Sequence, residues 1–288
     1  MALTIPAQLT ATCRTTPERA AWLAELPDTL RTLERRWALT LGPPFDGDGV
    51  TCAWVAPVWR ADGTTAVLKV GMPHMEGEHE IEALRFWNGD PTVHVLEADD
   101  DRRAMLLERC KPGTPLRTRP EREQDVVIAR LLRRLWRSPA PPRAFRPLSA
   151  MTAHWSADTL AQAEYWPDTG LVREGLRLFK ELPQSAPAAV LLATDLHAGN
   201  VLHAQREPWL VIDPKPFVGD PAYDATQHLL NCDARLRSDP DGTIRRFADL
   251  LGVDQERVRL WTFARAAAES RDDWKDGGLM DLARVTAP

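Results

Sequence analysis

Three polar residues in the second half of the chain have types and spacing that could do chemistry. Asp195 and Asn200 are five residues apart, and Asp213 ends a short apolar run thirteen residues later. A carboxylate on a loop can accept the proton of a substrate hydroxyl. Amide and carboxylate oxygens are the ligands that Mg²⁺ prefers in proteins. The spacing therefore indicates a metal-assisted transfer to a hydroxyl group, with Asp195 aligning the hydroxyl and Asn200 and Asp213 holding the metal.

The first third of the chain offers the cationic group that such a reaction needs. Only 5 of the 36 basic residues are lysines, and Lys69 is the only one before residue 111. It lies in an apolar, β-branched run, where its ammonium could reach the phosphates of a nucleotide. Four glutamates, at positions 76, 78, 80 and 82, belong to the next expected helix. At least three of them are interpreted as a solvated face, and Glu80 is the one expected to pair with Lys69. A loop containing Gly47 and Gly49 could cover the phosphates with its backbone N–H groups, although it is a poor glycine-rich motif.

The elements that must position these groups follow from periodicity. A strand-rich first third and a helical remainder predict an α+β protein with two lobes. The expected elements are two short helices over 17–37 broken at Pro27, a hairpin ending at 65–70, a helix over 76–87, strands near 93–97, 104–107, 188–192 and 209–213, and a helix opened by a capping box at Thr118 and Glu121.

The composition of the chain limits the classes of molecule that it is expected to bind. The formal net charge is −5, which argues against a general nucleic-acid binder and leaves a cationic small molecule open. The basic stretch 111–150 is interpreted as a solvated arginine face. The four cysteines are far apart and are expected to be reduced thiols. With no apolar run long enough for a membrane span, we expect a soluble, cytoplasmic and monomeric protein.

Four segments give the chain a resemblance to a known family. They are LLATDLHAGNVL, PWLVIDPKPFVGDPAYDATQHLLN, AVLKV and HEIEALRFW. They resemble the aminoglycoside phosphotransferases, in particular the streptomycin 6-phosphotransferase and hydroxyurea phosphotransferase branch. The resemblance implies a two-lobed protein-kinase-like fold, with a small antiparallel N-lobe over 1–107, a hinge over 108–113 and a larger helical C-lobe over 114–288. It also implies ATP and Mg²⁺ as cofactors.

The same resemblance assigns further roles. Leu107 and Arg109 would bind adenine through their backbone groups. Many relatives have a histidine two residues before the catalytic aspartate, where this chain has Ala193, so an orienting contact is either missing or supplied by another group, such as His197. His197 is favoured as a structural loop residue rather than a base, and Asp224 as a helix-start carboxylate that bonds back to the catalytic loop.

The substrate is the most open question at this stage. Glu269, Asp272 and Asp273 form an acidic cluster where the family would place its aminocyclitol site, and they could pair with guanidinium groups. A charged helix end is an equally good interpretation, since basic residues alternate with them. Phosphorylation of streptomycin at the 6-position is the leading hypothesis. Hydroxyurea or another small hydroxyl compound is the alternative, followed by a nucleotide-binding pseudokinase scaffold.

Overall fold

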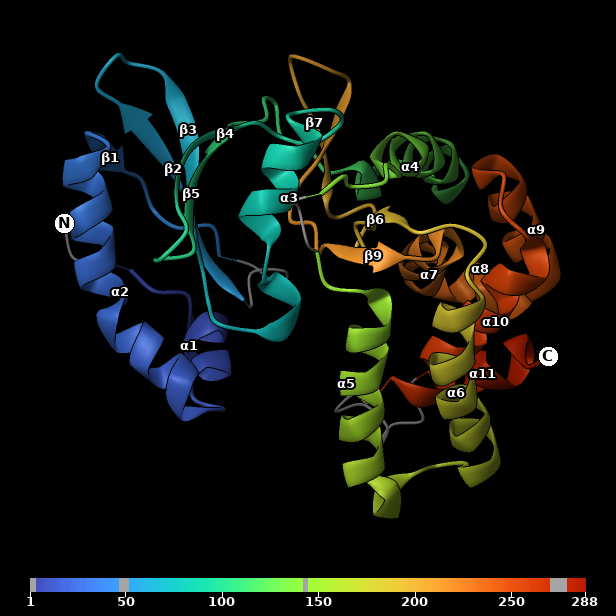
Figure 1. Ribbon diagram of the computed structural model, residues 1–288. Coiled ribbons are helices and arrows are strands. Elements are labelled where there is room, and N and C mark those ends of the chain that lie inside the picture. Colours follow the sequence, from blue (N-terminus) through green and yellow to red (C-terminus); the bar gives the residue numbers. More distant parts are fainter. Residues whose placement is uncertain (1–3, 47–51, 142–144, 270–278) are drawn as a thin grey trace. The chain divides into compact units, whose positions relative to one another are not determined.

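A computed structural model describes residues 4–46, 52–141, 145–269 and 279–288. Figure 1 colours the chain by residue number, from blue at the N-terminus to red at the C-terminus. The chain divides into two compact units. The first contains the chain up to Pro115 and the segment Leu202–Ile212, and the second contains Leu116–Val201 and Asp213–Pro288. The antiparallel sheet of the first unit and the helices of the second agree with the predicted α+β class.

The first unit is built on a five-stranded sheet of order β1-β2-β3-β5-β4, in which all neighbours are antiparallel. Alternation along β3 sends Ala66, Leu68 and Val70 into the core that contains Leu26, Leu30 and Leu33 of α2. Val67 packs in a second cluster with Ile81 and Leu84 of α3. Lys69 therefore shares the α3 side of the sheet with Val67. The elements are α1 (Ala7–Cys13), α2 (Pro17–Arg36), β1 (Leu39–Leu41), β2 (Ala53–Arg60), β3 (Thr65–Gly71), α3 (Glu80–Trp87), β4 (Val95–Asp99) and β5 (Ala104–Glu108).

The prediction of two helices broken at Pro27 was wrong, because α2 runs unbroken from Pro17 to Arg36 through that residue. A proline inside a helix costs about 3 kcal/mol through a lost hydrogen bond and a steric clash. Leu26, Leu30 and Leu33 are each 1% exposed or less and bury a continuous stripe against the sheet. Burial of such side chains contributes about 1.5–3 kcal/mol each, which outweighs the cost of Pro27.

Two other helix starts also differ from the sequence predictions. The segment expected to be helical from residue 76 forms a 3₁₀ turn, Met75–Gly77, and α3 begins only at Glu80, because His79 has a left-handed backbone with φ 64°. The helix α4 (Glu121–Leu135) has Pro120 at its N-cap position and no side-chain cap, so the capping box at Thr118 does not form. Proline fixes φ but donates no hydrogen bond, and it suits the chain just before a helix.

The second unit surrounds a nearly all-buried helix, α10 (Gln255–Ala268). Its small buried residues Ala264, Ala267 and Ala268 let α6 approach closely, and a Cβ at Gly175 of α6 would lie only 2.8 Å from that of Ala268. The other helices are α5 (Leu148–Ala161), α6 (Thr169–Glu181), α7 (Pro221–Asn231), α8 (Asp233–Ser238), α9 (Pro240–Leu251) and α11 (Met280–Thr286). Two short strands, β6 (Val190–Leu192) and β9 (Phe217–Gly219), pair antiparallel and bracket the segment of interest.

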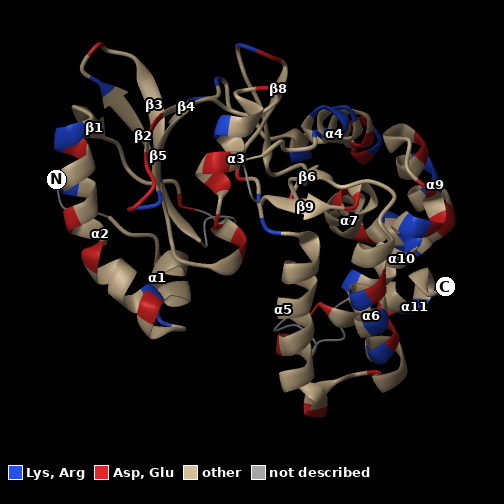
Figure 2. Cartoon of the chain, in the orientation of Figure 1, with Lys and Arg blue, Asp and Glu red and all other residues tan. Residues whose placement is uncertain are grey.

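Basic and acidic residues both occur along these helices (Figure 2). On α4, Arg122, Arg130 and Arg133 are exposed, which agrees with a solvated arginine face for much of the basic stretch. A separate two-stranded sheet is formed by β7 (Val201–His203) and β8 (Trp209–Val211). The sequence analysis predicted β8 but not β7, because three residues are too few to show the alternation of a strand. Over the described residues, the helices include none with the length and hydropathy of a membrane span.

Candidate active site

The segment that leads to Asp195 is held by a buried carboxylate from α7. Asp224, 1% exposed, accepts hydrogen bonds from the backbone N–H groups of Ala193 at 3.1 Å and Thr194 at 2.8 Å. The indole Nε1 of Trp136 donates to the same carboxylate at 2.9 Å. The contact predicted between Asp224 and the catalytic loop is therefore present. It fixes the backbone at Ala193, the position that lacks the histidine of many relatives.

Asp195 follows a residue with an unusual backbone conformation and has an electrostatically unusual carboxylate. The preceding Thr194 has a left-handed φ of 47°, and the Asp195 N–H turns back to donate to the carbonyl of Ala193 at 2.7 Å. Burial raises the pKa of Asp195 to about 6, against the attraction of Lys215 and with added repulsion from Asp213. A carboxyl group with a pKa close to neutrality is suited to accept a proton during a reaction.

The rest of the loop is folded by local hydrogen bonds. The Nδ1 atom of His197 accepts from the N–H of Gly199 at 3.1 Å, and the His197 carbonyl accepts from the N–H of Asn200 at 2.9 Å. Burial lowers the pKa of His197. These contacts support its predicted structural role, since an Nδ1 that accepts from the backbone belongs to a ring that shapes the turn. The Asn200 side chain donates from Nδ2 to the carbonyl of Asp195 at 3.0 Å, which orients its amide.

Asp213 follows β8 and has a left-handed backbone with φ 53°. Its Oδ1 atom accepts a hydrogen bond from the ammonium of Lys215 at 2.7 Å, and Lys215 is only 7% exposed. The backbone of Lys215 is tied to the catalytic loop, because its N–H donates to the Ala193 carbonyl at 2.8 Å and its own carbonyl accepts from Thr194 Oγ1 at 2.6 Å. These bonds hold the segments of Asp195 and Asp213 side by side.

Asp213 and Asn200 offer oxygen atoms, which are the donors that a magnesium ion prefers. Asp213 supplies carboxylate oxygens, and the amide of Asn200 is oriented by its Nδ2 bond so that its oxygen is the remaining polar atom of the group. Mg²⁺ is commonly bound by one or two such protein ligands together with water and substrate phosphate. The two residues predicted to hold the metal therefore have the required chemistry.

In the first unit, Lys69 and Glu80 form a buried ion pair. The Lys69 ammonium donates to Glu80 Oε1 at 2.5 Å, and the two side chains are 9% and 7% exposed. Of the four glutamates around this helix, Glu80 alone was selected from the sequence, and it is the one that reaches the lysine. Buried charges are retained in proteins when they are paired. This pair is the arrangement expected of a phosphate-positioning lysine.

The segment predicted to bind adenine lies at the end of β5. Leu107 is within the strand, between Val67 of β3 and Val95 of β4, whereas Arg109 follows the end of the strand. Glu108 accepts hydrogen bonds from the guanidinium of Arg206, the shortest at 2.9 Å. This ion pair ties the segment Leu202–Ile212 to the end of β5, within the first unit.

Of the acidic cluster proposed for substrate binding, only Glu269 lies within the described residues, while Asp272 and Asp273 lie outside them. Gly47 and Gly49 lie outside them as well. Glu269 is 12% exposed in its side chain and accepts from Nε of Arg265 at 2.9 Å. Both residues interact electrostatically with Asp195, so the structure brings Glu269 into the surroundings of the catalytic carboxylate.

Arg265 is a site residue that the sequence analysis missed. It is 3% exposed, donates to Thr226 Oγ1 at 2.8 Å and to Gln227 Oε1 at 2.7 Å, and its guanidinium lies against the rings of Trp155 and Tyr223. Nothing in the local sequence distinguishes it from the many exposed arginines. Lys215 was also missed, but a signal existed: it is a lysine in an arginine-rich chain, two residues after Asp213.

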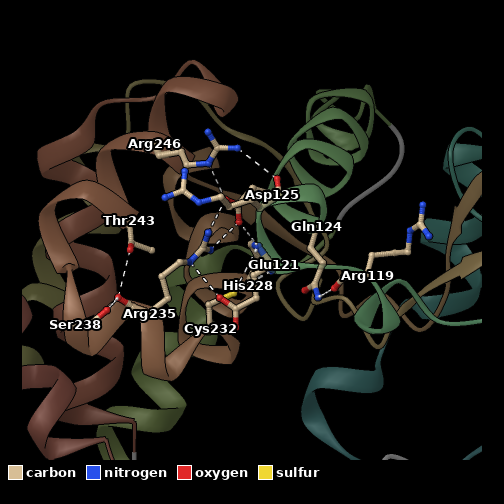
Figure 3. A network of polar contacts seen from close by, with 11 residues as sticks. Arg119, Glu121, Gln124, Asp125, His228, Cys232, Arg235, Ser238, Thr243 and Arg246 are labelled. Atoms are coloured by element: carbon tan, nitrogen blue, oxygen red, sulfur yellow. Dashed lines mark hydrogen bonds and ion pairs between the residues drawn. The ribbon is translucent and has the colours of Figure 1, made fainter.

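A second buried polar network lies between α4 and the α7–α9 region (Figure 3). Asp125 accepts two hydrogen bonds from Arg235 at 2.7 Å, one from Nε of Arg246 at 3.0 Å, and shares a 2.9 Å bond with His228 Nε2. Asp125, His228 and Cys232 have ligand atoms close enough to hold a metal ion. The two guanidinium groups already occupy both oxygens of Asp125, and a divalent cation would face their charge. The network is therefore a structural anchor.

Solved structures with a similar fold are kinases. The choline kinase from Streptococcus pneumoniae superposes with a TM-score of 0.65 at 12% sequence identity, covering 90% of this chain and 99% of that structure. This likeness confirms the predicted two-lobed, protein-kinase-like fold. The aspartate loop and the buried lysine–glutamate pair described above belong to a chain with this fold.

The particular family follows from sequence. Residues 36–278 match the family described as aminoglycoside/hydroxyurea antibiotic resistance kinase. Streptomycin 6-kinase from Streptomyces glaucescens is 37% identical in an alignment 282 residues long that covers 93% of this chain and 90% of the relative. Hydroxyurea phosphotransferase from Kitasatospora aureofaciens is 36% identical, over 88% of this chain and 74% of the relative. The chain belongs to this family of resistance kinases, as the sequence resemblance predicted, and is a phosphotransferase that acts on a hydroxyl group.

Proposed function

We propose that the chain transfers the γ-phosphoryl group of ATP to a hydroxyl of streptomycin, at the 6-position, and so inactivates the antibiotic. The observation that supports this most is the loop of Asp195, whose carboxylate has a pKa raised to about 6 and whose backbone is fixed by Asp224. The relatives named streptomycin 6-kinase support the choice of substrate.

Within this proposal, Asp195 accepts a hydrogen bond from the substrate hydroxyl, aligns its oxygen for in-line attack and takes its proton late in the transfer. Lys69, held by Glu80, contacts the nucleotide phosphates and offsets their charge. Leu107 and Arg109, on the segment 108–113 or next to it, are proposed to contact adenine through their backbone. Transfer is direct, so no phosphorylated enzyme intermediate forms.

Asn200 and Asp213 are the proposed magnesium ligands. When bound, the ion neutralises charge on the nucleotide phosphates. One test with a matched control separates this role from a structural one. Asp213→Asn should weaken Mn²⁺ binding to the nucleotide complex, measured by electron paramagnetic resonance, while Asp249→Asn, a change at an exposed position on α9, should not.

Glu269 is proposed to bind a guanidinium group of streptomycin. Arg265 fixes one edge of this carboxylate, and a planar guanidinium on the substrate can pair with a carboxylate through two hydrogen bonds. Asp272 and Asp273 are retained as candidates for the same role. Hydroxyurea carries no such cation, which makes Glu269 a residue that distinguishes the two substrates.

The experiment that tests the proposed function is direct. Purified protein is incubated with Mg-ATP and separately with streptomycin, other aminoglycosides and hydroxyurea, and the products are analysed by mass spectrometry and NMR. We expect one added phosphate on streptomycin at the 6-hydroxyl, absent with Asp195→Asn. Product from hydroxyurea alone would favour the second candidate, which the hydroxyurea phosphotransferase relative supports. No product from any compound would favour a nucleotide-binding scaffold.

A substitution then tests the substrate contact. Glu269→Gln should raise the KM for streptomycin by about tenfold or more, since a charge-assisted contact is lost, with little change in the KM for ATP. If hydroxyurea is also a substrate, the KM for hydroxyurea should not change.

A cytoplasmic monomer is likewise proposed, and size-exclusion chromatography with light scattering tests the oligomeric state.

A further inference from the structure

Lys215 stands out as a buried cation that the proposed reaction has not used. Its side chain is 8% exposed, and its ammonium donates to Asp213 Oδ1 at 2.7 Å. Among the charged groups around Asp195, Lys215 has the largest electrostatic effect. A buried ammonium loses hydration, and this cost must be offset by the charges it faces. In this molecule those charges are carboxylates assigned to the reaction.

The position of this ammonium is determined by the backbone on both sides. Pro214 and Pro216 restrict the chain around Lys215. The Lys215 N–H and carbonyl are both bonded to residues that immediately precede Asp195, namely Ala193 and Thr194. The lysine is thus bound to the catalytic loop by its main chain while its side chain contacts Asp213. Such a residue is placed more exactly than a surface lysine on a free loop.

The charges imply what the ammonium does when substrates are present. In phosphoryl transfer, negative charge is spread over the oxygens of the group in transit, between the acceptor aligned by the aspartate base and the nucleotide held at the metal. Lys215 faces Asp195 and contacts Asp213, which are assigned to these two functions. An ammonium has three N–H donors, and one of those of Lys215 bonds to Asp213 Oδ1. Cations at this stage of the reaction lower the barrier because they oppose the developing charge.

We propose that Lys215 is a further catalytic residue, whose ammonium binds the γ-phosphoryl group and stabilises it during transfer. This inference rests on the proposed function, because it assumes an ATP donor at the loop of Asp195. It differs from a scaffolding role, in which Lys215 would only hold Asp213 in place. The two roles make different predictions for nucleotides with and without a γ-phosphate.

The test compares the affinities of wild type and Lys215→Met for AMPPNP and ADP, each with Mg²⁺, by isothermal titration calorimetry. Loss of a charge-assisted contact to the γ-phosphate should weaken AMPPNP binding by about tenfold or more and leave ADP affinity within about twofold. The turnover number should fall by at least a hundredfold. Lys180→Met, a change at an exposed lysine of α6, is the matched control and should alter neither affinity.

An equal loss for both nucleotides, or no loss for either, would overturn the inference and leave Lys215 a scaffold for Asp213. Lys215→Arg retains the charge and should keep much of the preference for AMPPNP over ADP, which covers the case in which the methionine variant folds poorly. A preference equally lost in a folded Lys215→Arg would also count against a role of the charge. Wild type that binds neither nucleotide would contradict the proposed function itself, which separates the two failures.

Discussion

Asp224 and Thr194 are 30 residues apart in sequence and joined by a buried hydrogen bond, in which the Thr194 N–H donates to Asp224 Oδ1 at 2.8 Å. Asp224 has no chemical role in the proposed transfer. By accepting this bond and that of Ala193, it determines the direction in which the next residue, Asp195, leaves the strand. The main chain at Ala193 and Thr194 is thus held by Asp224, without a histidine side chain at position 193.

The first prediction concerns this contact. Asp224→Ala leaves three buried donors without an acceptor, those of Ala193, Thr194 and Trp136. Each unsatisfied donor costs about 1–3 kcal/mol, so the free energy of unfolding should fall by about 3 kcal/mol or more in urea titrations. The turnover number should fall with it, because Asp195 is no longer held. Asp100→Ala, at an exposed position in the first unit, should change neither quantity. A fully active, stable Asp224→Ala would show that the loop is held by other groups.

The second prediction is the pH dependence of the reaction. The ionised form of Asp195 is the one that accepts a proton, and burial raises its pKa to about 6. We expect kcat/KM, which reports on the free enzyme, to fall about tenfold per pH unit below this value and to reach a plateau above it. Circular dichroism at each pH checks that the protein remains folded. A profile that stays flat down to pH 4.5 would contradict Asp195 as the base.

The third prediction is the stability of the Asp195→Asn variant. Since the pKa of this carboxyl is raised in the folded state above its ordinary value of 3.8, its ionised form destabilises the fold. The cost is fully present above about pH 6 and disappears as the pH falls below 3.8. Removing the charge should therefore stabilise the protein at pH 7.5 by about 1–2 kcal/mol, seen as a higher Tm, with a smaller gain at pH 5. A lower Tm at pH 7.5 would mean that Asp195 has stabilising partners when ionised.

The local part of the site was predictable from the sequence because its spacing is set by one short loop. Asp195, His197 and Asn200 lie within six residues, and the hydrogen bonds among them are local. Lys69 was indicated by its place in an expected strand, whereas Glu80 was chosen among four glutamates by the pattern that small-molecule kinases have at this helix. Arg265 and Asp224 belong to different helices and approach the loop only through tertiary packing, so their contacts cannot be deduced from periodicity. The family resemblance supplied Asp224, whereas no local pattern marked Arg265.

The errors in the fold prediction have one physical origin. At Pro27, His79 and Pro120, local preferences were used to place helix boundaries, and packing or backbone geometry decided otherwise. A proline in α2 is tolerated because three leucines bury one face of that helix. The predicted α+β class was nevertheless correct, because it depends on the long alternating and helical stretches of the sequence rather than on where each stretch ends.

The fourth prediction concerns the pair of Lys69 and Glu80. Glu80→Met leaves the Lys69 ammonium buried without its carboxylate, which should destabilise the protein by about 3 kcal/mol or more. The double variant Lys69→Met with Glu80→Met replaces both charges by apolar groups and should recover most of this loss, while remaining unable to bind ATP tightly. Chemical unfolding and nucleotide titration measure the two effects separately. Glu82→Met, on the same helix but partly exposed, is the control, and equal damage from it would assign the effect to the helix rather than to the ion pair.

The fifth prediction addresses the anchor around Asp125. Burial raises the pKa of Asp125, but the hydrogen bonds and charges of Arg235 and His228 outweigh it and lower the pKa. The carboxylate of Asp125 therefore stabilises the fold above its ordinary pKa of 3.8 and less as the pH falls below that value. Asp125→Asn should remove about 3–5 kcal/mol at pH 7, the usual cost of breaking a buried ion pair, and the difference from wild type should shrink in acid.

The same variant separates structure from catalysis. Asp125 joins α4 to α7, α8 and α9 through one carboxylate, and the hydrogen bonds described above for it go to His228, Arg235 and Arg246 rather than to the loop of Asp195. At a temperature where Asp125→Asn is still folded, its KM for ATP and its turnover number should remain within about twofold of wild type. Unfolding monitored by tryptophan fluorescence gives the free energy of unfolding. Steady-state kinetics on the folded fraction gives the KM for ATP and the turnover number. A large kinetic defect without a loss of stability would mean that this network influences the reaction itself, and its description as an anchor would have to be abandoned.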